Sequence, residues 1–187
     1  MGDISNKTLA ALVVVAIVAS LGSTLVLMNK TSVSPTGRVA GQAQVNVSAI
    51  VAISLVVNSV NFGTVFQGYN ASTDGGTPAP LLLQNDGGVA VNVSASGTAL
   101  FSGTGGGDNT ASFQFKARDG NEPGSFNTTA SVMSYTNVTL AAQNNFVSRL
   151  KYQDATDTAQ IDLKIQVPLD EPVGLKTSTL TFVATEA

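Results

Sequence analysis

The sequence predicts a mostly β protein, in which an N-terminal hydrophobic helix is followed by an antiparallel β-sandwich of the jelly-roll or immunoglobulin-like kind. Three observations predict it. One long uncharged apolar run lies near the N-terminus, most later segments alternate apolar and polar residues, and Gly, Pro, Asn and Asp separate those segments. No helical periodicity follows residue 30, so we expect the helix and the β region to be separate parts of the chain.

The N-terminal part, residues 1–30, is expected to form one hydrophobic helix. Leu9–Met28 contains no charged residue, and a helix of that length spans roughly 30 Å, the thickness of the hydrocarbon layer. Four alternatives fit such a segment: an uncleaved signal anchor, a cleaved signal peptide, a pilin-type helix in a filament core, or a buried helix of a soluble protein. Small residues four apart, such as Ala16 and Ser20, would allow close helix packing. In the pilin-type alternative, a charge at Val15 would block assembly.

Residues 31–41 are expected to form a polar linker, because they contain Pro35 and two glycines. The segment 44–57 is apolar at every odd position, which indicates a strand rather than a second membrane helix. Its extended length would be about 46 Å, well beyond an ordinary strand of about five or six residues. We therefore expect this strand to bend between two sheets or to pair outside its own domain. The residues that could anchor it in a neighbouring molecule are Val45, Val47, Ala49, Val51 and Ile53.

The β domain is expected to cover residues 42–187 and to contain eight or nine strands. Asp86, Gly87 and Gly88 form a turn signal between two apolar segments, which predicts a hairpin there. Beyond residue 60 the predicted strand segments are 61–68, 80–85, 89–96, 112–118, 131–140, 145–152, 159–167 and 178–185.

The composition excludes several classes of function. The chain has no Cys and no His, which removes the usual zinc sites, thiol nucleophiles and Ser-His-Asp triads. Charged residues make up 11% of the chain and the net charge is −3, so no basic patch is available for a nucleic acid. We expect a protein that is not an enzyme, has no cofactor and has no resident metal.

Three smaller features invite a chemical interpretation. The glycine-rich stretch 103–108 lacks the Lys-Ser/Thr of a phosphate-binding loop, so we expect a plain loop. Lys116 and Lys164 lie on predicted strands, where an isopeptide bond to an Asn would be the covalent alternative. A group of carboxylates without EF-hand spacing is expected to be solvated rather than to bind calcium. Its members are Asp154, Asp157, Asp162, Asp170 and Glu171.

Asn-X-Ser/Thr acceptors for N-glycosylation occur in both parts of the chain, including Asn6 and Asn29 close to the apolar run. Those in the β domain predict a glycosylated outer surface, against the alternative of accidental matches in a Ser/Thr-rich β surface. The candidates in the β domain are Asn46, Asn70, Asn92, Asn127 and Asn137.

The end of the chain, VPLDEPVGLKTSTLTFVATEA, resembles the C-terminal hairpin of exported β-sandwich proteins of the camelysin/TasA type and of archaeal bundling-pilus subunits. In these proteins a Pro/Gly connection leads into a last strand that is matched here by Thr179 to Thr185. The resemblance implies a structural protein that makes fibres by lending an N-terminal strand to a neighbour. The layout is also similar to that of archaeal pilins, although a Lys/Arg-Gly processing site before the helix is missing.

We therefore expect a non-enzymatic protein of the cell surface or extracellular space, a repeating subunit of a filament or coat built by strand addition. Its partners would be copies of itself and, unless the N-terminal helix is cleaved, the membrane. The alternatives are a membrane-anchored monomeric domain for adhesion or partner binding, and a pilin-like subunit with its helix in the filament core.

Overall fold

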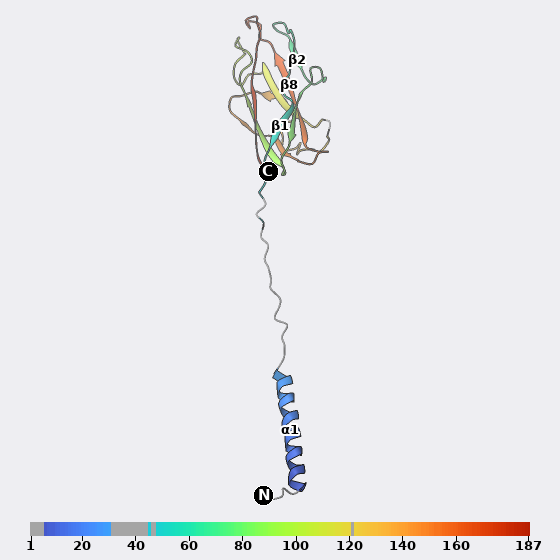
Figure 1. The fold of residues 1–187 in the computed structure, drawn as a ribbon. Coiled ribbons are helices and arrows are strands. Elements are labelled where there is room, and N and C mark those ends of the chain that lie inside the picture. The colour runs from blue at the N-terminus through green and yellow to red at the C-terminus, as the bar shows by residue number, and fades with distance from the viewer. Residues whose placement is uncertain (1–5, 31–44, 46–47, 121) are drawn as a thin grey trace. The chain divides into compact units, whose positions relative to one another are not determined.

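The computed structural model describes residues 6–30, 45, 48–120 and 122–187, with only the backbone given for residues 9 and 20–30 (Figure 1). The chain divides into two compact units, residues 1–46 and residues 47–187. We call the second unit the β domain. The predicted start of that domain at residue 42 differs by only a few residues from this division.

The first unit contains the helix α1, Asn6–Lys30. Val15 and Ala16 lie on it with exposed side chains. Leu9, Ser20 and Met28 belong to the same helix, but their side chains lie outside the described residues. Within the described part of the chain, no helix combines the length and the apolarity that a membrane crossing requires.

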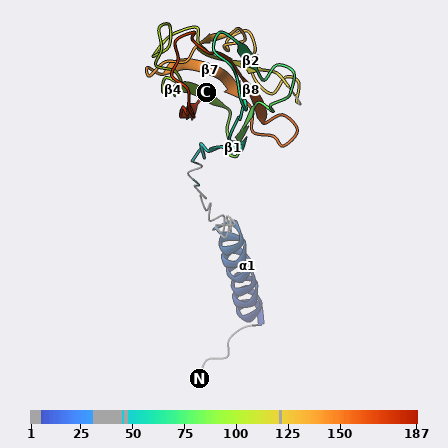
Figure 2. The same cartoon turned by 90° about the horizontal axis from the view of Figure 1, so that it is seen from above.

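The β domain consists of two antiparallel sheets (Figures 1 and 2). In the larger sheet the strands follow the order β1-β3-β8-β5-β6, and β2 pairs with β8 beyond the end of β3. Its strands are β1 (Ile53–Val57), β2 (Asn70–Ser72), β3 (Leu81–Asn85), β5 (Phe113–Arg118), β6 (Thr136–Asn137) and β8 (Thr158–Gln166). The smaller sheet has the order β7-β4-β9. Its strands are β4 (Val91–Gly97), β7 (Gln143–Leu150) and β9 (Leu180–Glu186). The hairpin predicted at residues 86–88 is therefore wrong, because that turn carries the chain from β3 in one sheet to β4 in the other.

One hydrophobic core fills the space between the two sheets. Strands β3 and β4 alternate buried and half-buried residues without a break, as a period of two requires of strands with one face on the core. Phe115 on β5 and Phe146 on β7 are fully buried and have ring centroids 4.4 Å apart, so they join the sheets at the centre. Each such aromatic side chain contributes about 3 kcal/mol or more to the stability of a core.

The long strand predicted over residues 44–57 is wrong in its extent. Only Ile53–Val57 is a strand, β1, and residues 48–52 form no strand. The cause is the turn after β3: the Gly88 N–H donates to the Ile50 carbonyl at 2.9 Å, and a Cβ on Gly87 would lie 2.4 Å from that oxygen. The turn therefore holds the Ile50 backbone beside Gly87 and Gly88, where it forms no strand pairing with β3.

The side chains before β1 are consequently left without a core of their own. Val45 is 84% exposed and Ile50 is 66% exposed. Exposing aliphatic side chains to water has an unfavourable free energy. Ala49 is also exposed and Val51 is 40% exposed. Val47 lies outside the described residues.

Candidate functional site

An open groove lies where the outer strands of the two sheets meet. β1 is the last strand of the larger sheet and β9 is the last strand of the smaller one, so each keeps one edge without a neighbouring strand in the described chain. Leu55 of β1 and Leu180 of β9 both line a cavity of about 1020 Å³ between these edges. We call this cavity the edge groove.

The floor of the edge groove is the hydrophobic core itself. Phe101 and Phe113 line it together with Leu81 of β3, and all three side chains are buried. β8 contributes two more buried side chains, Leu163 and Ile165. A groove floor of this kind can bind apolar side chains but offers no polar groups that converge on one point.

The walls of the groove are two irregular segments outside both sheets. One wall, residues 58–67, continues β1, and its half-buried side chains Val60, Phe62 and Val65 pack against the core. The other wall, residues 171–179, leads into β9, and we call it the strap. Sequence reasoning assigned a strand to part of the first wall and missed the groove altogether.

The backbone of both walls is largely unpaired. Among the described residues, the N–H groups of 59–66 and of 173–178 donate to no other backbone group. Gly63 is bonded only to the Asn61 side chain, at 2.8 Å. Backbone groups seek partners strongly, so these N–H groups beside an apolar floor are available to an added segment. The two walls meet where the Gln67 side-chain amide donates to the Glu171 carbonyl at 2.6 Å.

Glu171 fixes the start of the strap. Its side chain is only 2% exposed and accepts hydrogen bonds from the N–H groups of Ser102 and Gly103, at 2.8 and 2.6 Å. The Lys176 ammonium lies 2.5 Å from the same carboxylate. Lys176, followed by the two N–H donors, lowers the pKa of Glu171 to about 2, against its burial. The strap is thus anchored at one end while its middle stays unpaired.

Acid should loosen this anchor. A carboxylate with a lowered pKa stabilises the fold fully above its ordinary pKa near 4.5, and this contribution is lost as the pH falls towards 2. We expect the melting temperature of the native chain to fall between pH 5 and pH 2, and Glu171→Gln to lower it at pH 7 and to flatten its acid dependence. Glu186→Gln, at an exposed position, is the matched control for thermal melting across this pH range. An unchanged acid dependence in Glu171→Gln would contradict the assignment.

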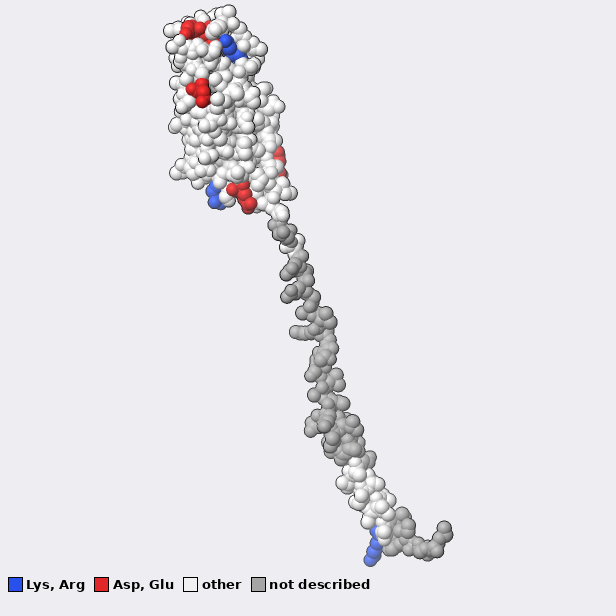
Figure 3. Space-filling view, turned by 90° about the vertical axis from the view of Figure 1, so that its left-hand side faces the viewer, with Lys and Arg blue, Asp and Glu red and all other residues white. Residues whose placement is uncertain are grey.

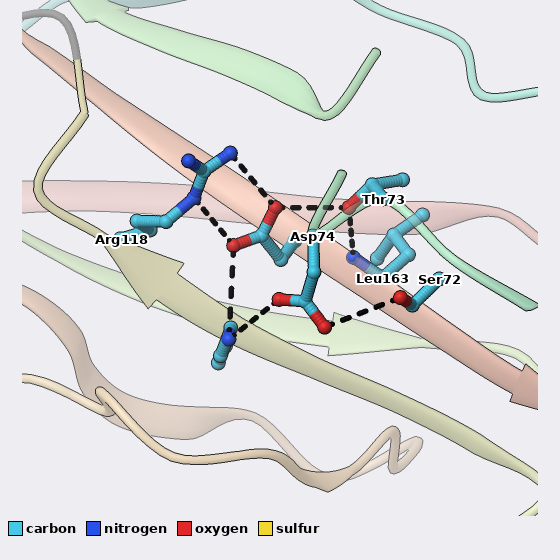
Figure 4. Close-up of polar contacts among 7 residues, drawn as sticks. Ser72, Thr73, Asp74, Arg118 and Leu163 are labelled. Carbon is cyan, nitrogen blue, oxygen red and sulfur yellow. Dashed lines mark hydrogen bonds and ion pairs between the residues drawn. The ribbon is translucent and has the colours of Figure 1, made fainter. Parts of the chain in front are cut away.

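A second polar cluster lies on the outer face of the larger sheet (Figure 4). Asp162 on β8 is fully buried and accepts hydrogen bonds from the Arg118 Nε at 2.7 Å and from the Thr73 hydroxyl at 2.9 Å. The Thr73 hydroxyl in turn accepts the Leu163 N–H at 3.0 Å. The prediction of solvated carboxylates is therefore wrong for Asp157, Asp162 and Glu171, which are all buried.

Lys116 completes this cluster. Its ammonium lies 2.7 Å from Asp74 and 3.9 Å from Asp162, beneath the ring of Tyr135, whose centroid is 4.4 Å away. Lys116 lowers the pKa of Asp74, and burial together with Asp74 raises the pKa of Tyr135. The partners of Lys116 are thus carboxylates rather than an Asn, so the arrangement for a Lys–Asn isopeptide bond is not present at this lysine. The cluster ties the loop after β2 to β5 and β8.

The glycosylation candidates differ in how free their side-chain amides are. Asn70 and Asn127 are exposed, and Asn127 uses only its amide oxygen, which accepts the Thr129 N–H at 3.1 Å. Asn92 is half-buried, and its oxygen accepts the Arg149 N–H at 3.0 Å. Asn137 is half-buried and donates its amide nitrogen to the Asn109 carbonyl at 3.1 Å. Asn46 lies outside the described residues.

Asn70 and Asn127 are therefore the acceptors that we expect to carry glycans. Modification of Asn137 would break the hydrogen bond of the nitrogen to which a glycan is joined. Peptide mapping by mass spectrometry on native material should find glycan at Asn70 or Asn127 and an unmodified Asn137. Occupied Asn137 beside bare Asn127 would show that this structural ranking fails.

Comparison with family models, with curated proteins and with solved structures finds no match for this chain. The resemblance of Thr179–Thr185 to the last strand of camelysin/TasA-type proteins therefore stays a prediction. The candidate function depends on the geometry of the edge groove and of the segment before β1.

Proposed function

We propose that this protein is a non-enzymatic structural subunit of an extracellular filament or coat, in which each copy adds a strand to the next. The donor segment is residues 44–52, and the acceptor is the edge groove of another copy. One observation carries the proposal: an apolar groove with largely unpaired walls occurs in the same chain as an alternating apolar segment whose described side chains Val45, Ile50 and Val51 are exposed.

The donor segment would be about 30 Å long when extended. In an inserted strand the odd positions Val45, Val47, Ala49 and Val51 would face the groove floor, while the even positions would face outwards. Ile53 already belongs to β1 and pairs with Asn85, so the predicted anchor at this position serves its own domain instead.

Insertion into the chain's own groove is opposed by connectivity. Residue 52 continues directly into β1, which borders the groove, and no turn residues separate the donor segment from that strand. Gly88 holds the Ile50 carbonyl at the turn after β3, so the donor segment cannot double back beside β1 without releasing it. The groove of a second copy does not require the donor segment to double back beside its own β1.

The surface of the domain also favours association. Monomeric β proteins usually protect exposed strand edges with charged side chains. Here charges are sparse, and in the view of Figure 3 the acidic and basic side chains lie mainly towards the ends of the domain, with a largely uncharged surface between them. Few charges therefore oppose pairing at the edges of β1 and β9.

Engineered disulfides test strand addition directly, because the native chain has no Cys. Full chains with Ser48→Cys, an outward-facing donor position, are mixed with tagged full chains carrying a Cys in the first wall, at Ser59, Asn61 or Thr64. We expect disulfide-linked heterodimers with at least one of these wall positions, since neighbouring strands bring Cα atoms within disulfide range.

The control is a tagged chain with Val183→Cys, which is 53% exposed and lies on the outer face of β9. It should give no heterodimer with Ser48→Cys above the random background. Equal cross-linking of the control and of all three wall positions, or none at the wall, would refute strand addition. In that case the groove would serve the alternative function, capture of a foreign extended peptide by a monomeric surface domain.

Export to the cell surface, the immunoglobulin-like or jelly-roll type of the sandwich, and the membrane or pilin-core role of Leu9–Met28 belong to the same proposal. They are supported by the sequence pattern of the N-terminal run and by the two antiparallel sheets that share one core. Strand addition itself needs none of them, because its donor and acceptor both lie beyond residue 43.

A further inference from the structure

Five large apolar side chains are exposed at one end of the β domain. Their exposed fractions range from 67% for Tyr69 to 95% for Val173, far above what burial in a domain core would leave. Exposed apolar side chains gathered in one place mark interaction surfaces more often than isolated ones do. We call this group the apolar tip, and its members are Phe66, Tyr69, Leu169, Val173 and Leu175.

Direct contacts and a shared cavity bring these residues together. The rings of Phe66 and Tyr69 meet edge to face, with centroids 6.3 Å apart. Leu169 closes on Gly68, where a Cβ would lie 2.8 Å from the leucine side chain. Phe66, with Val173 and Leu175 of the strap, also lines the edge groove. The apolar tip is thus continuous with the groove.

The donor segment leaves its own domain at the opposite end. Ile50 is bonded to Gly88, and the C-terminal Ala187 N–H donates to the Ala90 carbonyl, which places the donor segment and the C-terminus at one end. Tyr69 directly precedes β2, which lies near the other end of the domain, away from the C-terminus (Figure 1). The end that carries the donor segment is called the base.

We propose that the apolar tip is the seat for the base of the next copy, and that this contact sets the direction of the inserted strand. The inference rests on strand addition as proposed above. Because no linker separates residue 52 from β1, the donor's own domain must begin within a residue or two of the groove end at which the donor segment leaves.

Only one direction of the inserted donor strand would place the next domain over the apolar tip. The strap leads into β9 at the tip, and β9 ends at the base beside β4. A donor strand antiparallel to β9 therefore leaves the groove at the tip, and its domain lands there base first. A strand of the opposite direction would leave at the base and would keep all five side chains in water. The partner is therefore a second copy of this chain, stacked base on tip.

Cysteine accessibility in the assembled protein tests this seat. Leu169→Cys is introduced into the full chain together with the disulfide pair that reports strand addition, and a maleimide reagent is applied to dispersed and assembled chains. We expect Leu169→Cys to react at least about tenfold more slowly after assembly, while Val183→Cys on the outer face of β9 reacts at the same rate in both.

A pair of substitutions provides the second measurement. Val173→Ser with Leu175→Ser removes two side chains that are almost fully exposed, so the fold should not depend on them. We expect the concentration for half-assembly to rise at least about tenfold for each side chain, since burying a Val or Leu is worth more than one factor of ten in affinity.

The outcomes separate the two proposals. Assembly with unchanged reactivity at Leu169→Cys, or unaffected by the double serine variant, overturns the seat and leaves strand addition standing. If Ser48→Cys and the wall cysteines form no disulfide in chains without tip substitutions, strand addition and the seat are both refuted. Protection of Leu169→Cys in dispersed chains would show that something other than a second copy covers the tip, and would also overturn the proposal.

Discussion

A chain with Val47→Asp and Ala49→Asp is expected to remain monomeric at concentrations at which the native protein is fully assembled. In the inserted strand both positions would face the groove floor formed by Phe101 and Phe113. A carboxylate there is removed from water without a partner, which costs several kcal/mol and therefore about a thousandfold or more in affinity. Sedimentation and electron microscopy of the purified chain measure the effect.

The matched control places the same two charges on the other face of the same segment. Asn46→Asp with Ser48→Asp adds an equal net charge, and both side chains would point away from the groove. We expect this chain to assemble within about tenfold of the native concentration, because solvated charges near a strand edge cost little. If both pairs block assembly equally, general repulsion rather than strand insertion is responsible, and the donor segment has been assigned wrongly.

Alternation predicted most of the β domain, because the pattern reports which face of a strand needs burial. β3, β4, β5, β8 and β9 lie where the period of two placed them, and each has a face on the core. The same pattern in residues 44–52 predicted a strand, and the described residues 48–52 form none. Alternation indicates that one face of a segment is apolar. It does not indicate whether that face is buried in the same molecule or in a neighbouring one.

The edge groove could not be predicted from the sequence. In the described part of its walls, residues 58–67 and the strap, most backbone N–H groups donate to no other backbone group, and an unpaired backbone leaves no mark on side-chain periodicity. The groove exists because β1 and β9 happen to be the last strands of facing sheets. That is a property of strand order, which propensities and turn signals do not encode.

The polar clusters were missed for a related reason. Asp162 alternates correctly to the outer face of β8, and an outer face normally means water. It is buried because Thr73, 89 positions earlier in the chain, and Arg118 on the neighbouring strand close over it. Contacts between segments so far apart in the sequence are invisible to local patterns, so the most tightly held carboxylate of the outer face was predicted to be solvated.

Asp162→Asn is expected to lower the free energy of unfolding of the β domain by about 3 kcal/mol. Breaking a buried ion pair by changing one partner costs about 3–5 kcal/mol, and the half-exposed Arg118 can be rehydrated in part, which places the effect at the lower end of that range. Denaturant unfolding of the full chain measures the change. The control is Asp86→Asn, an exposed carboxylate in the turn after β3, for which we expect a change below about 0.5 kcal/mol.

If Asp162 stabilises the domain by holding the loop after β2, Asp162→Asn should loosen that loop before it loosens the rest of the domain. Thr73 bonds to β8 twice, because its N–H donates to the Leu163 carbonyl at 3.0 Å and its hydroxyl accepts the Leu163 N–H at the same distance. In Asp162→Asn one carboxylate oxygen becomes an NH₂ group, so the side chain can no longer accept fully from both Arg118 and the Thr73 hydroxyl. Hydrogen exchange should therefore accelerate at Thr73 and Leu163 before it does at the core of β4. Uniform acceleration, or a change in unfolding free energy below about 1 kcal/mol, would mean that the cluster does not hold the loop after β2 against the sheet.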